Sequence, residues 1–510
     1  MNNKWIILFV AISLLQPYDI MAKAKGKSYN PLDFGLADAA NGVERFWILY
    51  RTHELAKKTN APVTYKGVES LEIEIPVNAP SIPLSSNTDF CGLVLSVVCN
   101  YNNSILFELT QDVTPIEVSK EDVDDGYYGD NPILSKGTFL LQLSDENLWV
   151  KQRAGFDYGH QRMDIVYVKN GKAKNTTVFP YNNNETILSA RYCEVSPERK
   201  FFGNLIFRRK EGNSHVASLI VIDHQYNVEI ENIEIKTPVD TLYADQAIIA
   251  TNSCKIDFKN IRIDGTYSRP DAYGYGITMN NVYNVTFNRL YGHGNWGVFG
   301  NNNLNKIYLQ DCDINRFDVH CYGKDITCSH CAFHDLYNQF SSMNGSVVFK
   351  DCEFYNFIPF QYETSFNAYT KFSLVFKQCS VYATNDKNYL IDVRGLSGIE
   401  TGERTELREQ KYPDLVVNGL TVYLENGNGP YYIYNQGNNF INKSTKVPDV
   451  IGVKRVKVMT DGKVGSFRLG TIENIVSQLR TGVFVVGGGL ACCVITYKAT
   501  RRKKQSGNNA

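Results

Sequence analysis

One short pattern recurs ten times in the second half of the chain, and it constrains the fold more than any other feature of the sequence. It places apolar residues at a first position, three residues later and two residues after that. Successive copies lie between 19 residues (Leu309 to Cys328) and 41 residues (Phe376 to Val417) apart. A fixed pattern with variable spacing predicts the coils of one solenoid joined by loops of different length. The first positions are Phe202, Ile230, Phe258, Phe287, Leu309, Cys328, Phe349, Phe376, Val417 and Val453.

The pattern has the period of a β-strand. Ile233 and Ile235 flank Glu234, so successive side chains point to opposite faces. A strand, a corner and a second strand, repeated in this way, predict a parallel β-helix whose coils lie about 4.8 Å apart. We expect a third strand in each coil at residues 247–252, 276–281, 297–302, 319–324 and 340–345. Asn or Asp, which tolerate left-handed backbone, occupy the corner in five copies: Asn204, Asn232, Asn260, Asp311 and Asp351.

The second apolar position is a cysteine in four successive copies. Cys328 and Cys331 also form a C-x-x-C pair around His330, a spacing that suits zinc or redox chemistry. Both cysteines fall on positions that Phe, Leu and Ile take in other copies, so we interpret them as thiols buried in the core. The sequence therefore predicts no metal site and no cofactor. The column of cysteines is Cys312, Cys331, Cys352 and Cys379.

Composition limits the class of partner. The 510 residues include 53 basic and 53 acidic side chains, which leave no net charge. A chain without net charge has no overall positive potential that would attract nucleic acid or an anionic membrane. No nucleic-acid partner is therefore expected. The 32 tyrosines and 27 phenylalanines supply core residues and, we expect, exposed rings suited to stacking on sugars. The oligomeric state is left open.

Both ends of the chain indicate export. Lys4 precedes an apolar run over residues 5–15, and Ala22, Lys23 and Ala24 follow as a cleavage site, the pattern of a secretory signal. Residues 482–497 are apolar and have a basic flank at residues 501–504, which favours a membrane anchor over a terminal cap or strand. We expect an exported protein in the periplasm, at the cell surface or outside the cell, anchored through its C-terminal segment.

Residues 39–59 have the periodicity of an amphipathic helix. A helix directly before the first coils would cover the end of the solenoid, where strand edges and apolar lumen would otherwise be exposed. Its predicted apolar stripe is Val43, Phe46, Trp47, Tyr50 and Leu55.

The opening of the chain resembles a known superfamily. Asp33, Phe34 and Gly35 before the helix, and the strand-like residues 63–67 after it, resemble the start of pectate-lyase-like right-handed parallel β-helix proteins. That superfamily includes polysaccharide lyases, polygalacturonase-type hydrolases and phage tailspikes. Residues 41–44 lack the paired aspartates usual before its helix. The resemblance implies an all-β, right-handed parallel β-helix solenoid with an N-terminal capping helix. It also implies action on polysaccharide without fixing the reaction, since one fold hosts many activities.

Five segments follow from these features. Residues 112–195 lack the repeated pattern, and we expect a loop-rich β elaboration or a small β subdomain there. Asp157, His160 and Arg162 within it are interpreted as a surface turn. The other segments are a signal peptide over residues 1–24, a cap and first rungs over 25–111, the β-helix over 196–465 and a C-terminal segment over 466–510.

Polar side chains gather on the third strand of the middle coils. Asp318, His320 and Tyr322 alternate with Val319 and Cys321, which continue the inward columns, so the three polar residues should face solvent. Neighbouring strands and loops supply further candidates for substrate binding on this face: Arg269, Asp271, Tyr273, His293, Trp296, Gln339 and Glu363.

Two reactions on polysaccharide suit these residues. A lyase acting on a uronate needs a cation for the sugar carboxylate, either Arg316 or Arg269, and a base for the C5 proton, either His320 or Tyr322. A glycosidase needs two carboxylates separated by roughly 5–9.5 Å. Catalytic candidates are therefore Asp318, His320, Tyr322 and Arg316.

Asp318 and Glu363 are the candidate carboxylate pair for a glycosidase. They lie two coils apart, roughly 9.6 Å from the strand spacing, which is the outer edge of that range. Lyase and glycosidase both stay open, as does a non-catalytic module that binds glycan or serves a structural role. A tailspike is disfavoured because tailspikes lack the export signal that residues 5–15 indicate.

Overall fold

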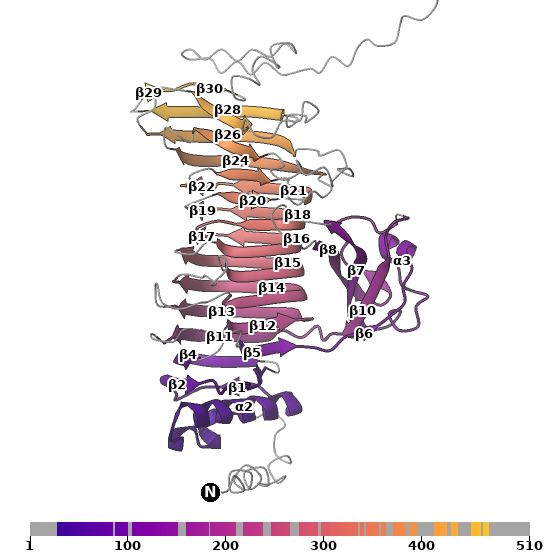
Figure 1. Ribbon diagram of the computed structural model, residues 1–510, viewed down its shortest axis with the longest axis vertical. Coiled ribbons are helices and arrows are strands. Elements are labelled where there is room, and N and C mark those ends of the chain that lie inside the picture. The colour runs from indigo at the N-terminus through magenta and orange to yellow at the C-terminus, as the bar shows by residue number, and fades with distance from the viewer. Residues whose placement is uncertain are drawn as a thin grey trace, which may run out of the picture.

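The computed structural model forms one long stack of parallel strands with a smaller sheet at its side (Figure 1). It describes residues 28–468 except 85–86, 100–104, 151–159, 183, 211–217, 238–245, 266–274, 294–296, 335–336, 341–342, 356–358, 364–370, 384–387, 395–412, 426–429, 437–449 and 461–462. The proposed signal peptide and residues 482–497 lie outside this range. None of the described helices is long and apolar enough to cross a membrane.

All but the first of the longer strands carry the first apolar position of the repeated pattern, and shorter strands complete the coils. The longer strands are β4 (Asn87–Val98), β11 (Lys200–Arg209), β13 (Tyr226–Lys236), β14 (Ile248–Asp264), β15 (Tyr275–His293), β16 (Gly297–Gln310), β18 (Asp318–Ser329), β21 (Met343–Lys350), β24 (Lys371–Ala383), β26 (Asp414–Leu424) and β28 (Val450–Thr460). The shorter ones are β1 (Val63–Thr64), β2 (Ser70–Glu74), β3 (Ile82–Pro83), β5 (Ile105–Thr110), β12 (Ser218–Asp223), β17 (Asp313–Ile314), β19 (Ala332–Phe333), β20 (Asn338–Phe340), β22 (Glu353–Phe354), β23 (Phe360–Glu363), β25 (Tyr389–Arg394), β27 (Tyr431–Gln436), β29 (Lys463–Val464) and β30 (Phe467–Arg468).

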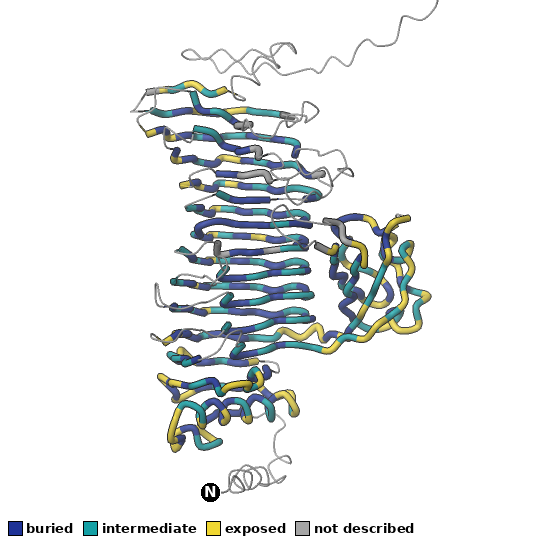
Figure 2. Tube along the Cα trace, viewed as in Figure 1, coloured by how far each residue is buried: buried dark blue, intermediate teal, exposed yellow. Residues whose placement is uncertain are grey.

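The ten copies of the pattern are in register. Phe202 lies beside Ile230 on the next strand, and the alignment of first positions continues step by step to Val417 beside Val453. The pattern therefore predicted which residues stack on one another. Buried residues recur along the coils of the stack (Figure 2). They form one core, in which Phe258 stacks on Phe287 with ring centroids 4.6 Å apart.

The corner residue has a positive φ in every copy, from 51° at Asn260 to 90° at Gly419. This confirms the predicted left-handed corner. Asn232 Nδ2 donates to Asn204 Oδ1 at 2.8 Å, and Asn260 Nδ2 donates to Asn232 Oδ1 at 2.8 Å. A ladder of side-chain amides thus joins three coils at the position where the backbone turns.

The four column cysteines lie inside the same core on successive coils, as predicted. Each thiol contacts backbone carbonyls, for example Cys352 Sγ with the oxygens of Cys328 and Lys350 at 3.4 and 3.3 Å. Burial raises the pKa of the neighbouring Cys328 thiol well above its usual value.

Helix α2 (Gly42–Thr59) lies across the first coil of the stack (Figure 1) and follows two short turns, η2 (Pro31–Phe34) and η3 (Leu36–Asp38). Phe46, Leu49 and Ala56 are fully buried in the common core. The predicted stripe is wrong at Trp47, which is 37% exposed. The buried face of the helix includes Thr52, and Trp47 lies outside that face. This helix also buries a histidine, His53.

Residues between β5 and β11 form a separate antiparallel sheet of five strands in the order β6-β10-β7-β8-β9. Its core contains Leu141, Leu143 and Val166. Its elements are β6 (Thr114–Pro115), α3 (Lys120–Asp125), β7 (Thr138–Val150), β8 (His160–Lys169), β9 (Lys172–Ala173) and β10 (Leu188–Glu194).

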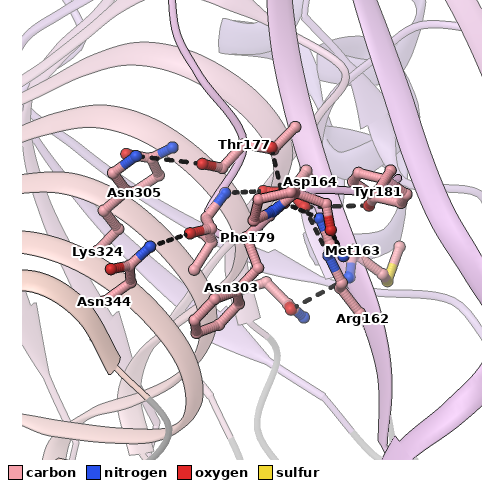
Figure 3. Close-up of polar contacts among 12 residues, drawn as sticks. Arg162, Met163, Asp164, Thr177, Phe179, Tyr181, Asn303, Asn305, Lys324 and Asn344 are labelled. Atoms are coloured by element: carbon pink, nitrogen blue, oxygen red, sulfur yellow. Dashed lines mark hydrogen bonds and ion pairs between the residues drawn. The ribbon is translucent and has the colours of Figure 1, made fainter. Parts of the chain in front are cut away.

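The interpretation of Arg162 as part of a surface turn is wrong. Arg162 is fully buried and pairs with Asp164, while the Tyr181 hydroxyl donates to Asp164 Oδ2 at 3.0 Å (Figure 3). Its guanidinium also donates to the carbonyls of Phe179 and Pro180, which fixes this segment. Asp157 and the side chain of His160 lie outside the described residues.

The residues between β5 and β11, which we call the insertion, also contact the β-helix through residues 176–178 (Figure 3). Asn305 Nδ2 donates to the Thr176 carbonyl at 2.7 Å, and Asn344 Nδ2 donates to the Val178 carbonyl at 2.6 Å. Lys324 Nζ donates to the Thr176 hydroxyl at 2.8 Å. Three coils thus hold the insertion through their side chains.

Candidate functional site

Arg316 and Asp318 form an ion pair at the start of β18. Both side chains are buried, Asp318 completely, so the prediction that Asp318 faces solvent is wrong. The physical reason is the pair itself, because each charge compensates the burial of the other. Arg316 is therefore engaged by Asp318, which removes it as a candidate for neutralising a sugar carboxylate.

His320 is the member of this group that reaches the surface. Its side chain is 15% exposed, and its Nε2 lies 3.1 Å from Asp318 Oδ2. With the proton on Nε2, His320 donates to the carboxylate of Asp318, which also pairs with Arg316. The buried carboxylate of Asp318 thus helps to fix the orientation of the His320 imidazole.

Tyr275, which the sequence analysis missed, completes the group. Its hydroxyl oxygen lies 3.0 Å from the same Nε2 of His320. Its ring packs over Gly300, where an added Cβ would lie 2.4 Å from the ring. Arg316, Asp318, His320 and Tyr275, the proton-transfer group, thus combine one buried ion pair with two side chains suited to moving a proton.

Tyr322 does not belong to this group. It is buried against Val178 and Phe179 of the insertion, together with Cys321. The strict alternation fails here because the pairing of β16 with β18 contains a register shift, and Tyr322 itself turns the backbone with a φ of 59°. The predictions of a solvent-facing Tyr322 and an inward Cys321 are both wrong.

The other predicted substrate-binding residues are only partly placed. Gln339 pairs with Asp318 across neighbouring strands and is buried. Glu363 ends β23, but its side chain lies outside the description, as do Arg269, Asp271, Tyr273 and Trp296. In the candidate carboxylate pair of Asp318 and Glu363, Asp318 is therefore buried in an ion pair, and the position of the Glu363 side chain lies outside the described residues.

His293 forms a second cluster of its own. Its Nε2 lies 2.7 Å from Asp313 Oδ1, and His334 Nε2 lies 2.8 Å from the same oxygen. Sequence reasoning missed Asp313 and His334. The repeated pattern held the signal, because His293 and His334 both directly follow the third position of a copy, which is Gly292 in the first case and Phe333 in the second.

Exposed tyrosines continue from His334 along the stack. Tyr355 stacks on His334 at a centroid distance of 4.9 Å, Tyr382 on Tyr355 at 4.4 Å and Tyr423 on Tyr382 at 4.9 Å. Their planes lie within 13° of one another in each pair. The ring faces therefore cover each other, so this column offers ring edges and hydroxyls rather than stacking platforms for sugars.

A surface hollow of about 620 Å³ lies over the corner ladder. Its lining includes Asn204, Asn232 and Asn260, whose amides bond one another. None of the predicted site residues lines it.

No known family model matches the chain, and no curated protein matches its sequence. Solved structures that share its architecture include two phage tailspikes. The tailspike gp49 of Pseudomonas phage LKA1 is 12% identical, with a TM-score of 0.56 over 87% of this chain and 77% of the tailspike. The gp54 tailspike of Acinetobacter baumannii bacteriophage AP22, solved in complex with A. baumannii capsular saccharide, is 11% identical, with a TM-score of 0.50 over 85% and 76%.

At these identities the likeness concerns the fold and not the class of protein, so the preference against a tailspike stays a prediction. Both tailspikes are right-handed parallel β-helix proteins. The chain shares the β-helix architecture that its opening segment resembles.

Proposed function

We propose that the protein cleaves a uronate-containing polysaccharide by elimination, with Tyr275 and His320 handling the proton. The support for this proposal is that the Tyr275 hydroxyl lies beside His320 Nε2, and that the same nitrogen contacts the buried carboxylate of Asp318. The reaction needs Tyr275 as a phenolate when the substrate is bound, and His320 Nε2 is the hydrogen-bonding atom that lies beside its oxygen. An oxygen in that state is a suitable base for the acidic C5 proton of a uronate.

The proposed reaction balances with one residue as base and acid. The Tyr275 phenolate takes the C5 proton, a double bond forms between C4 and C5, and the C4–O glycosidic bond breaks. The leaving oxygen then takes the proton back from Tyr275. Elimination is preferred over hydrolysis because Asp318 is buried against Arg316 and is not placed to protonate a sugar oxygen.

The other predicted residues keep substrate-binding roles as part of this proposal. Arg269, six positions before Tyr275 in the sequence, is the proposed cation for the uronate carboxylate, with Asp271, Tyr273 and Trp296 as further contacts. Export through residues 1–24 would bring the protein to extracellular polymers. The saccharide complex of the gp54 tailspike supports a polysaccharide as the class of ligand.

Non-catalytic binding of a glycan is the second candidate. It needs no catalytic group, and it agrees with the burial of Arg316 and Asp318 in an ion pair that can be purely structural. A panel of acidic and neutral polysaccharides separates the two. Ultraviolet absorbance of unsaturated uronate products supports elimination, whereas reducing ends without that absorbance indicate hydrolysis. Binding without any cleavage would leave only the second candidate.

A further inference from the structure

Two imidazoles and one carboxylate converge on the outside of three successive coils. His293 ends β15, Asp313 begins β17 and His334 directly follows β19. One possible ligand atom from each of the three side chains lies within 4.8 Å of the other two. We propose that these three residues bind a divalent transition-metal ion, with Zn²⁺ as the best match.

The ligand set selects the class of ion. Imidazole nitrogen suits zinc, copper, nickel and iron, whereas calcium and magnesium prefer shells made of oxygen atoms. Two histidines and a carboxylate are a protein ligand set found at zinc sites that keep a further position for water or substrate. The ion would bind Nε2 of each imidazole, with the remaining ring proton on Nδ1, and an oxygen of Asp313.

The geometry needs only a small adjustment to accept the ion. Zinc ligands at about 2.0–2.1 Å in a tetrahedron are roughly 3.3 Å apart. The two Nε2 atoms now lie 2.7 and 2.8 Å from Asp313 Oδ1, so each imidazole must move away from that oxygen by roughly 0.5 Å. The ligand atoms of the two imidazoles, within 4.8 Å of each other, must come to the same separation. The side chains are 26%, 50% and 29% exposed for His293, Asp313 and His334, which leaves the site open to solvent on one side.

Aromatic neighbours hold both imidazoles in place. Tyr291 contacts His293 with ring centroids 4.7 Å apart, and Tyr355 stacks on His334 at 4.9 Å with an interplanar angle of 7°. The Arg262 guanidinium lies 4.0 Å from the centre of the Tyr291 ring. The rings at both ends, together with the fixed spacing of the coils, keep the two histidines facing each other across Asp313.

Titration of the full-length protein with Co²⁺ and Zn²⁺ tests the proposal without any enzyme assay. The wild type should bind one Co²⁺ here with visible ligand-field absorption, and Zn²⁺ should displace it. His334→Phe keeps a ring on Tyr355 and His293→Phe keeps one beside Tyr291, but each removes a ligand nitrogen. Each should weaken binding by about tenfold or more, since even changes outside the ligand shell cost about 10–100-fold. Asp313→Ala should do the same.

His330→Ala is the matched control, because His330 faces a carboxylate, Asp351, at 3.8 Å on the same stack. It should bind Co²⁺ like the wild type. Circular dichroism confirms that each variant is folded. If the folded wild type gives no visible absorption with Co²⁺, or if the three ligand variants bind as the wild type does, the cluster is a hydrogen-bonded network and the proposal is overturned.

Discussion

The hydroxyl oxygen of Tyr275 lies 3.0 Å from Nε2 of His320, although a complete coil separates the strands that carry them. Gly300 on the intervening strand makes this approach feasible, because a Cβ there would lie 2.4 Å from the Tyr275 ring. Gly300→Ala should therefore move the tyrosine and lower cleavage by about tenfold to a hundredfold, in keeping with the sensitivity of catalysis to small displacements.

Gly452→Ala is the control for this change, because an added Cβ there meets nothing within 4 Å. Its rate of cleavage should equal that of the wild type. Equal rates in the Gly300 and Gly452 variants would show that the position of Tyr275 has no bearing on cleavage.

Removal of the Tyr275 hydroxyl should be more severe. Tyr275→Phe is expected to lower kcat by about 10²–10⁴-fold, the usual contribution of a proton-transfer group, while the oligosaccharide still binds. Tyr382→Phe removes a hydroxyl from an exposed, stacked ring and should have no effect. Product absorbance gives the rate and calorimetry the affinity. A Tyr275→Phe variant with wild-type turnover rules out the proposed base.

His53 should make the protein less stable in acid. Burial lowers its pKa to about 3, and its Nε2 lies 2.9 Å from the Tyr65 hydroxyl. Below pH 6.5 the unfolded chain binds a proton at this histidine that the folded chain does not. Its contribution to the free energy of unfolding should therefore fall by about 1.4 kcal/mol per pH unit between about pH 6.5 and 3.

Urea unfolding at several pH values checks this expectation. The double variant His53→Leu, Tyr65→Phe removes the titrating group and its partner together, so its stability should fall less steeply with acid. His330→Ala changes an exposed histidine and should follow the wild type. Parallel curves for the wild type and the double variant would contradict the assignment to His53.

The corner amides should contribute to stability in two separable ways. Asn232→Ala places an alanine at a φ of 54° and also removes the bonds to Asn204 and Asn260. We expect a cost of about 1–3 kcal/mol from both effects together. Asn232→Gly keeps the backbone relaxed and should cost less. If the two variants unfold at the same urea concentration, the left-handed backbone is not what limits this position.

Thiol reactivity reports the buried column. Cys91 is exposed, whereas Cys312, Cys331, Cys352 and Cys379 are buried. Under native conditions iodoacetamide should modify Cys91 much faster than these four cysteines. In urea all five should react at similar rates. Peptide mass spectrometry measures each site. Modification of the column at the rate of Cys91 would mean that the coils are not stacked as described.

The repeated pattern was enough to predict the register of the stack from Phe202 onward, but it did not extend to the earlier rungs, of which β4 is the clearest example. In β4, Thr88 lies beside Phe202 and Leu93 beside Leu205. A polar first position and a corner widened by both Cys91 and Gly92, with φ values of 53° and 85°, hide this rung from the pattern. The sequence pattern missed β4 because its corner is irregular, although β4 pairs with β11 like the other strands.

The site was harder to predict because its environment comes from distant parts of the chain. Strand alternation placed Tyr322 in solvent, yet Phe179 of the distant insertion covers it. Asp318 is buried instead by an ion pair with Arg316, only two residues away, which alternation does not predict. Nothing in residues 318–322 indicates the contact with Phe179. His334 differs, since its place after the third apolar position would have aligned it with His293.

The position of a bound oligosaccharide tests the central claim most directly. A crystal structure of the Tyr275→Phe variant with an uncleaved uronate oligosaccharide should place a sugar ring within hydrogen-bonding distance of His320, with its C5 facing position 275. A saccharide bound only elsewhere, such as in the hollow over Asn204, Asn232 and Asn260, would contradict the proposed role of the proton-transfer group.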